Sequence, residues 1–193
     1  MSHGHGAAHG GGDNKFIAIF ISILALMLAL AETFGKGAQT NSISYNVEAS
    51  NLWSFYQAKT IRQTTLKTAA EQMEIDAQLS RDPATKAALD KRIAAWRGEV
   101  DRYQSEPKAD GKGEGRKELQ LRAIEAGKKR DLYMEKYHHY EVASAAFQIA
   151  IVLAGAYILV HNSIMLWIAG SLAVSGFFFT IVGFFFPSAI HLF

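Results

Sequence analysis

The distribution of charge constrains this chain more than any other feature of its sequence. All but three of its Asp, Glu, Lys and Arg residues lie between Lys36 and Glu141, and the stretches on either side are almost purely apolar. Residues 143–193 carry none of these four residue types, and residues 16–34 carry only Glu32. A charge at the centre of a bilayer costs about 3 kcal/mol or more, so such runs are typical of segments that cross lipid.

Segment lengths predict three membrane-spanning helices. The first, 15–35, has the roughly 20 residues that are needed to cross about 30 Å of hydrocarbon. The uncharged C-terminal stretch would form a helix of about 76 Å, which suits two crossings rather than one. Its only suitably placed polar interruption is His161-Asn162-Ser163. We therefore expect the second and third spans at 143–161 and 164–186, a C-terminal tail at 187–193, and a disordered His/Gly-rich tail at 1–14.

The charged block, residues 36–142, is predicted to be a water-exposed helical stalk. It holds 19 Lys and Arg against 16 Asp and Glu, and the opposite charges are interspersed as on a solvated helix surface. A nucleic-acid surface would show a concentrated basic patch, so nucleic acid is not expected as a partner. The chain has no cysteine, which excludes disulfides, thiol catalysis and thiolate metal sites.

Breaks and periodicity divide this stalk into three helices at about 40–80, 84–105 and 115–142. Asp82-Pro83 provides an N-cap acceptor and a proline at the first helical position of the second helix. That helix carries apolar residues at spacings of four and three, the a/d pattern of a short coiled coil: Leu89, Ile93, Trp96, Val100 and Tyr103. The fold expected is all-α, with a long antiparallel, coiled-coil-like stalk that has a partly three-stranded zone between the first and second spans.

The first span raises two further questions, whether the chain bends after it and whether it is a cleaved signal peptide. Gly35 and Gly37 could bend the chain where this span leaves the bilayer. Ala29-Leu30-Ala31 has the small-x-small form of a signal-peptide cleavage site, but only Lys15 precedes the apolar run, so an uncleaved helix is favoured. The alternative is that residues 1–31 are a signal peptide and are removed by cleavage.

Positive charges near the spans predict the orientation. Most of the flanking Lys and Arg lie on the stalk side: Lys36, Lys128, Lys129, Arg130 and Lys136. The opposite side offers only Lys15. The positive-inside rule therefore favours a cytoplasmic stalk, with the N-terminus and the short turn at His161–Ser163 outside.

Polar groups at the membrane suggest two weak sites. Glu32 is the only carboxylate in an apolar run, and Gln148 on a facing span could partner it in a proton or ion path. The simpler interpretation pairs Glu32 with Lys36 in the last turn of the helix. His3, His5 and His9 are weak metal-ligand candidates because they sit in a Gly/Ala tail that is more typical of a solvated segment.

Two motifs connect the chain to a known family. Glu48–Arg62 reads EASNLWSFYQAKTIR and Tyr137–Ser144 reads YHHYEVAS. Both resemble the membrane-protein family called domain of unknown function 4337, and the likeness extends over nearly the whole chain. The resemblance implies a bacterial, three-span, helical membrane protein, located as a multi-pass protein in the inner membrane. It implies no activity, substrate or catalytic residue.

The first motif also predicts an interaction patch. Aromatic and basic side chains crowd onto two turns of helix: Trp53, Phe55, Tyr56, Lys59 and Arg62. In a hairpin these side chains would face the region around Arg116–Glu125 of the returning helix. Trp, Tyr and Arg are favoured interface anchors, although a packed stalk seam with solvated cations would look similar.

No catalytic constellation or cofactor motif occurs, so neither an enzyme nor a cofactor is expected. The preferred function is a scaffold that self-associates or recruits a protein through its stalk; the alternative is a small transporter or channel subunit that uses Glu32 and Gln148.

Overall fold

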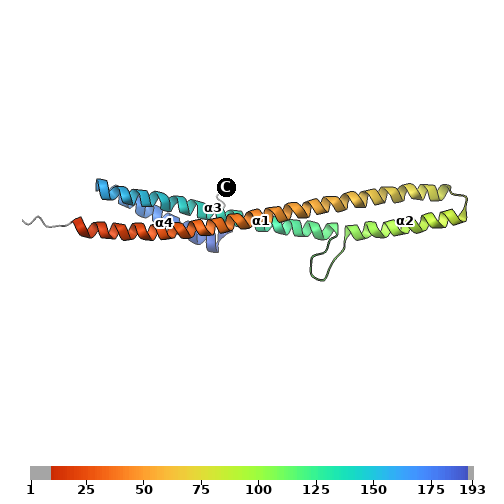
Figure 1. The fold of residues 1–193 in the computed structure, drawn as a ribbon, viewed down its shortest axis with the longest axis horizontal. Coiled ribbons are helices and arrows are strands. Elements are labelled where there is room, and N and C mark those ends of the chain that lie inside the picture. Colours follow the sequence, from red (N-terminus) through yellow and green to blue (C-terminus); the bar gives the residue numbers. More distant parts are fainter. Residues whose placement is uncertain (1–9, 191–193) are drawn as a thin grey trace, which may run out of the picture. The chain divides into compact units, whose positions relative to one another are not determined.

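A computed structural model describes residues 10–190, and over these residues the fold is entirely helical. The elements are α1 (Gly10–Leu79), α2 (Pro83–Gln104), α3 (Arg116–Val160), α4 (Ser163–Phe185) and a 3-10 turn η1 (Pro187–Ala189) (Figure 1). The chain divides into two compact units. The apolar unit comprises Met1–Ser42 and Asp131–Phe193, and the hairpin unit comprises Ile43–Arg130.

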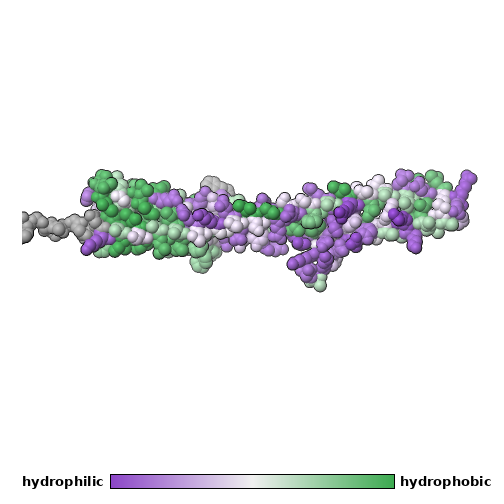
Figure 2. Space-filling model, viewed as in Figure 1, coloured by the Kyte–Doolittle hydropathy of each residue, from purple (hydrophilic) through white to green (hydrophobic). Residues whose placement is uncertain are grey.

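The apolar unit packs three helices that are long and apolar enough to cross a membrane. Its core is built mainly from small residues that let the helices approach closely. The buried members are Ile17, Leu24, Ala31, Ala143, Phe147, Ala150, Ala154 and Ala169. Large apolar side chains remain exposed around this core, and Figure 2 shows this apolar surface in green. Lipid-facing helices are expected to look like this, since apolar exposure is costly only in water.

Polar groups fix the ends of α3 and α4 within the apolar unit. His161 has a positive φ of 54°, which ends α3, and the Asn162 side chain accepts a hydrogen bond from the Ile164 N–H at 3.0 Å. After α4, the η1 turn is attached to α3. The Ser188 hydroxyl donates to Glu135 at 2.7 Å, and His139 Nε2 lies 2.9 Å from the Pro187 carbonyl oxygen. The segment expected as a tail at 187–193 is therefore ordered through η1.

Helix α1 is continuous across the junction where the sequence allowed a bend at Gly35 and Gly37. It begins at Gly10, so the predicted tail 1–14 is wrong over its last residues, and it continues through Gly35 and Gly37. The span expected at 15–35 and the stalk helix expected from residue 40 are one helix. Gly35 is buried, and a Cβ there would lie 3.4 Å from Tyr140 Cβ. Packing against α3 thus offsets the cost of about 1 kcal/mol that Gly35 brings to the helix interior.

Helix α1 pairs with α2 and then with α3 in the hairpin unit, and the expected three-stranded zone is wrong. The Gln63 amide reaches the carbonyl of Val100 near the end of α2 at 3.0 Å. The Tyr56 hydroxyl, two turns earlier, contacts Arg116 at the start of α3 at 3.0 Å. α2 and α3 therefore follow one another along α1 (Figure 1), because the loop 105–115 projects sideways and adds no length to the pairing.

A regular spacing of four and three marks the buried side of α1 in this unit. Every residue of α1 in that repeat is buried or half-buried: Tyr45, Ala49, Leu52, Tyr56, Lys59, Gln63, Leu66, Ala70, Met73 and Ala77. The five apolar residues that the sequence singles out in α2 are also buried or half-buried, and Ile93 is 6% exposed. We call these positions the seam of the hairpin unit.

Candidate interaction site

The site is built where α2 ends and α3 begins, around the guanidinium of Arg116. Its Nη2 donates to the Tyr56 hydroxyl at 3.0 Å, and its Cζ lies 5.0 Å from the centre of that ring. Its Nη1 donates to the side-chain oxygens of Gln63 and, at 3.2 Å, Gln104. One side chain of α3 thereby holds both α1 and the last turn of α2. A charge-assisted bond of this kind contributes about 1.5–3 kcal/mol.

The connecting loop is closed by the carboxylate of Glu118. It accepts a hydrogen bond from the Ser105 hydroxyl at 2.6 Å and one from the Glu106 N–H at 3.2 Å. Burial pushes the pKa of Glu118 upward, but these hydrogen bonds outweigh it and hold the pKa below its usual value. The loop closes tightly at Gly115, where a Cβ would lie 2.6 Å from the Cα of Ser105. Only glycine fits there without a backbone shift.

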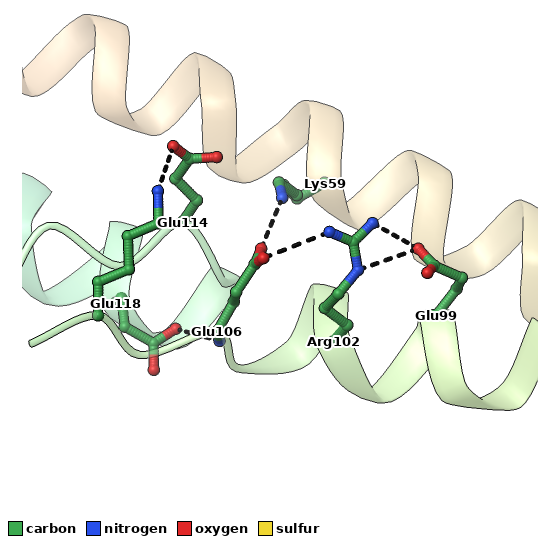
Figure 3. Close-up of polar contacts among 7 residues, drawn as sticks. Lys59, Glu99, Arg102, Glu106, Glu114 and Glu118 are labelled. Atoms are coloured by element: carbon green, nitrogen blue, oxygen red, sulfur yellow. Dashed lines mark hydrogen bonds and ion pairs between the residues drawn. The ribbon is translucent and has the colours of Figure 1, made fainter.

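A chain of ion pairs covers this junction (Figure 3). Arg102 contacts Glu99 at 2.6 Å and Glu106 at 3.3 Å, and Glu106 also lies 3.6 Å from Lys59. The Lys59 ammonium also lies 5.1 Å from the centre of the Tyr103 ring. Exposed ion pairs contribute at most about 1 kcal/mol each. Their main consequence is that the Lys59 charge is compensated within the hairpin unit.

A further ion pair lies within the loop between α2 and α3. Lys108 contacts Glu114 at 2.9 Å. The hydrogen bond and the charge of Lys108 hold the pKa of the Glu114 carboxyl below its usual value. The Glu114 charge is therefore also compensated.

A groove of about 410 Å³ opens beside this network. Its lining comes from α1, the loop and α3: Leu52, Phe55, Ala58, Lys59, Arg62, Glu114, Leu119 and Arg122. Phe55 is 64% exposed at its edge. Over residues 10–190, neither Arg62 nor Arg122 has a carboxylate partner within 4.0 Å. The groove therefore combines an exposed aromatic ring with two guanidinium groups that form no ion pair in this part of the chain, of which Arg122 also helps to lower the pKa of the Glu114 carboxyl.

The predicted patch is divided between this groove and the seam. Phe55, Lys59 and Arg62 line the groove. Tyr56 points into the seam against Arg116, and Trp53 packs edge-on against Tyr56 with ring centres 5.5 Å apart. The lengths of the expected helices predict that this patch faces the region around Arg116–Glu125 of the returning helix. Leu119 and Arg122 in the groove, and the contact of Tyr56 with Arg116, confirm that prediction. The sequence did not single out Arg116, Glu118 or Arg122 as individual site residues.

The comparisons with known proteins agree with the two sequence motifs. The family model described as "Domain of unknown function (DUF4337)" matches residues 13–186. The chain belongs to this family. No curated protein and no solved structure gives a significant match to this DUF4337 chain.

The polar pair of the apolar unit is also formed in this DUF4337 protein. The Gln148 amide donates to Glu32 at 3.3 Å, and both side chains are exposed. Glu32 lines a shallow depression together with Lys36, Gln39 and Glu141. Within the described part of the chain, no group of three His, Cys, Asp or Glu side chains could hold a metal ion. The candidate ligands His3, His5 and His9 lie outside the described residues.

Proposed function

We propose that this protein is a multi-pass protein of the bacterial inner membrane whose hairpin unit recruits another protein on the cytoplasmic side. Three helices of sufficient length and apolarity support the membrane assignment. The observation that supports the interaction role is the groove, where Phe55 is 64% exposed beside Arg62 and Arg122, two guanidinium groups that form no ion pair among the described residues. Large exposed aromatic and arginine side chains are the residue types that anchor protein interfaces.

The chemistry of the groove defines its occupant. Lys59 and Glu114 are compensated by Glu106 and Lys108, so the groove offers two positive charges and an apolar ring. A protein segment with a carboxylate next to an apolar side chain matches this arrangement, since guanidinium groups bind carboxylates in bidentate geometry. The seam spacing of four and three further supports a coiled-coil description of the hairpin that carries the groove.

Site-specific photo-crosslinking in cells tests this proposal. A photoreactive amino acid replaces Phe55 in the full chain, and a matched variant carries it at Ala95 on the exposed side of α2. We expect a discrete adduct only at position 55, which mass spectrometry maps to a segment with acidic and apolar residues. The double variant Arg62→Glu, Arg122→Glu should abolish this adduct, while Arg92→Glu should leave it. Equal labelling at both positions, or an adduct that survives the double reversal, contradicts the proposal.

One observation favours a second candidate function. The hydrogen bond between Gln148 and Glu32 joins two polar groups of the apolar helices, as a transporter or channel subunit would require. Reconstitution of the full chain into liposomes, followed by a pH-sensitive dye and by ion-flux measurement, tests it. If the wild-type protein gives a flux and Glu32→Gln abolishes it, transport replaces protein recruitment as the function. Absence of flux in the wild-type protein would remove the transport alternative.

A further inference from the structure

The side of α1 that faces away from α2 and α3 lacks the charges of an ordinary solvated helix. We number α1 in heptads that start with Ser42 at position a, which puts the seam residues at positions a and d. The outward face is then the set of residues at positions b, c and f from Ile43 to Leu79. All of these residues are exposed, and Glu71 is the only charged one among them. In the shorter α2, with its apolar seam residues at a and d, three of the nine b, c and f positions carry exposed charges: Lys91, Asp101 and Arg102. A solvated helix usually carries such charges on its outer side.

An apolar stripe runs along the middle of the outward face. The f positions recur every seventh residue as Val47, Ser54, Ile61, Thr68 and Ile75. The three apolar members are 53%, 67% and 51% exposed in chain order. A period of seven keeps a stripe on one line relative to the seam, as on a helix that packs along its length against another helix.

Two hydroxyls of this face are already hydrogen-bonded within α1. The Ser54 hydroxyl donates to the carbonyl of Ser50 at 3.0 Å, and the Thr65 hydroxyl donates to that of Ile61 at 2.9 Å. These hydroxyls keep a hydrogen bond when the face is covered, so their burial avoids the cost of an unsatisfied group. The outward face is therefore suited to contact with another protein surface.

We propose that a second copy of this chain covers the outward face, with the two α1 helices parallel and in register. In a symmetric pair each residue meets its own counterpart, so charged faces repel each other, whereas a face whose single charged residue is Glu71 gives little repulsion. The parallel direction rests on the proposed function, because two copies in one membrane share one orientation. The face is roughly 55 Å long and about 10 Å wide, so a pair covers about 1,100 Å², near the lower limit for a stable interface.

Disulfide trapping tests the pairing, since the chain has no native cysteine. Single cysteines replace Val47, Ile61 and Ile75 in the full chain, and Ala95 on the exposed side of α2 serves as the matched control. Mild oxidation in membranes should give a disulfide-linked dimer at all three positions, several-fold above the control. Crosslinking at Ile61 alone would overturn the parallel register. Crosslinking no greater than at Ala95 would overturn the pairing itself.

A charge variant separates this inference from the proposed function. Ile61→Lys places a like charge at the centre of the pair, and we expect the molar mass in detergent to fall twofold by light scattering. Leu121→Lys, at a 61% exposed position of α3, should leave the mass unchanged. An Ile61→Lys protein that keeps the wild-type mass contradicts the pairing. If the pairing fails but the adduct at Phe55 persists, the recruiting groove stands without self-association.

Discussion

At the scale of single residues, two glycines of the hairpin unit have opposite surroundings. A Cβ at Gly115 would lie 2.6 Å from Ser105 Cα, whereas a Cβ at Gly98 would meet nothing within 4 Å. Gly115→Ala should lower the free energy of unfolding by about 1–3 kcal/mol, because backbone must move. Gly98→Ala should raise it by about 0.5–1 kcal/mol, because alanine favours the helix. Urea unfolding in detergent, followed by circular dichroism, measures both, and equal effects would contradict this description.

The contact between Tyr56 and Arg116 is a second test at this scale. Tyr56→Phe removes the hydroxyl that accepts the 3.0 Å hydrogen bond and keeps the ring. We expect a loss of about 1.5–3 kcal/mol, as for other hydrogen bonds to charged groups. In an Arg116→Met background the same change should have almost no effect, since the donor is gone. A double-mutant cycle measures the coupling, and additive losses would show that the two groups act independently.

Glu118 should make the loop sensitive to acid. Its hydrogen bonds from Ser105 and Glu106 stabilise the charged form, so its pKa is lower in the folded than in the unfolded chain. This contribution is complete above the unfolded value near 4.5 and is lost as the pH falls through the folded value. Hydrogen exchange of loop 105–115, corrected for the intrinsic pH dependence, should report weaker protection below that pH. Glu118→Gln should exchange faster at pH 7 and lose this dependence; an unchanged pH profile would contradict the role of Glu118.

At the scale of elements, α2 is held to α1 through a short seam in which Ile93 is 6% exposed. Ile93→Ala should destabilise the hairpin unit by about 2–4 kcal/mol through lost burial and the resulting cavity. Leu121→Ala, at a 61% exposed position, provides the control and should change stability by less than about 0.5 kcal/mol. Hydrogen exchange over α2 measures the local effect. Equal protection in the two variants would show that α2 is stabilised elsewhere.

Helices α1 and α2 also differ in how well the sequence predicts their contacts. Asp82 caps α2 as expected, accepting from the Thr85 N–H at 2.9 Å, because capping depends on neighbours in the chain. The seam of α1 was predicted only in part. Leu52, Tyr56, Leu66 and Met73 are apolar seam residues, but the seam also contains Ala49, Lys59 and Gln63, and the apolar Ile43 and Val47 lie outside it. Hydrophobic periodicity fails where small and polar residues pack against a partner helix.

At the scale of the whole molecule, the proposed orientation can be tested with single cysteines and a membrane-impermeant thiol reagent. Asp110 lies in the loop of the hairpin unit and Ser163 begins α4, and both are exposed. Ala7 belongs to the segment outside the described residues. In intact cells we expect labelling at Ala7 and Ser163 and none at Asp110, because the positive-inside rule favours a cytoplasmic hairpin. The reverse pattern would invert the orientation, and lysed cells serve as the control for accessibility.

The sequence by itself determined the all-helical character, the three apolar helices and the family, because these depend on composition, chain length and local motifs. The tertiary structure alone decided that α1 runs unbroken through Gly35 and Gly37, and that α2 and α3 follow one another along it. It also decided that Phe55 and Arg62 share a groove with Arg122. Each of these features depends on contacts between residues far apart in the chain, and a pattern along one segment carries no information about its partner.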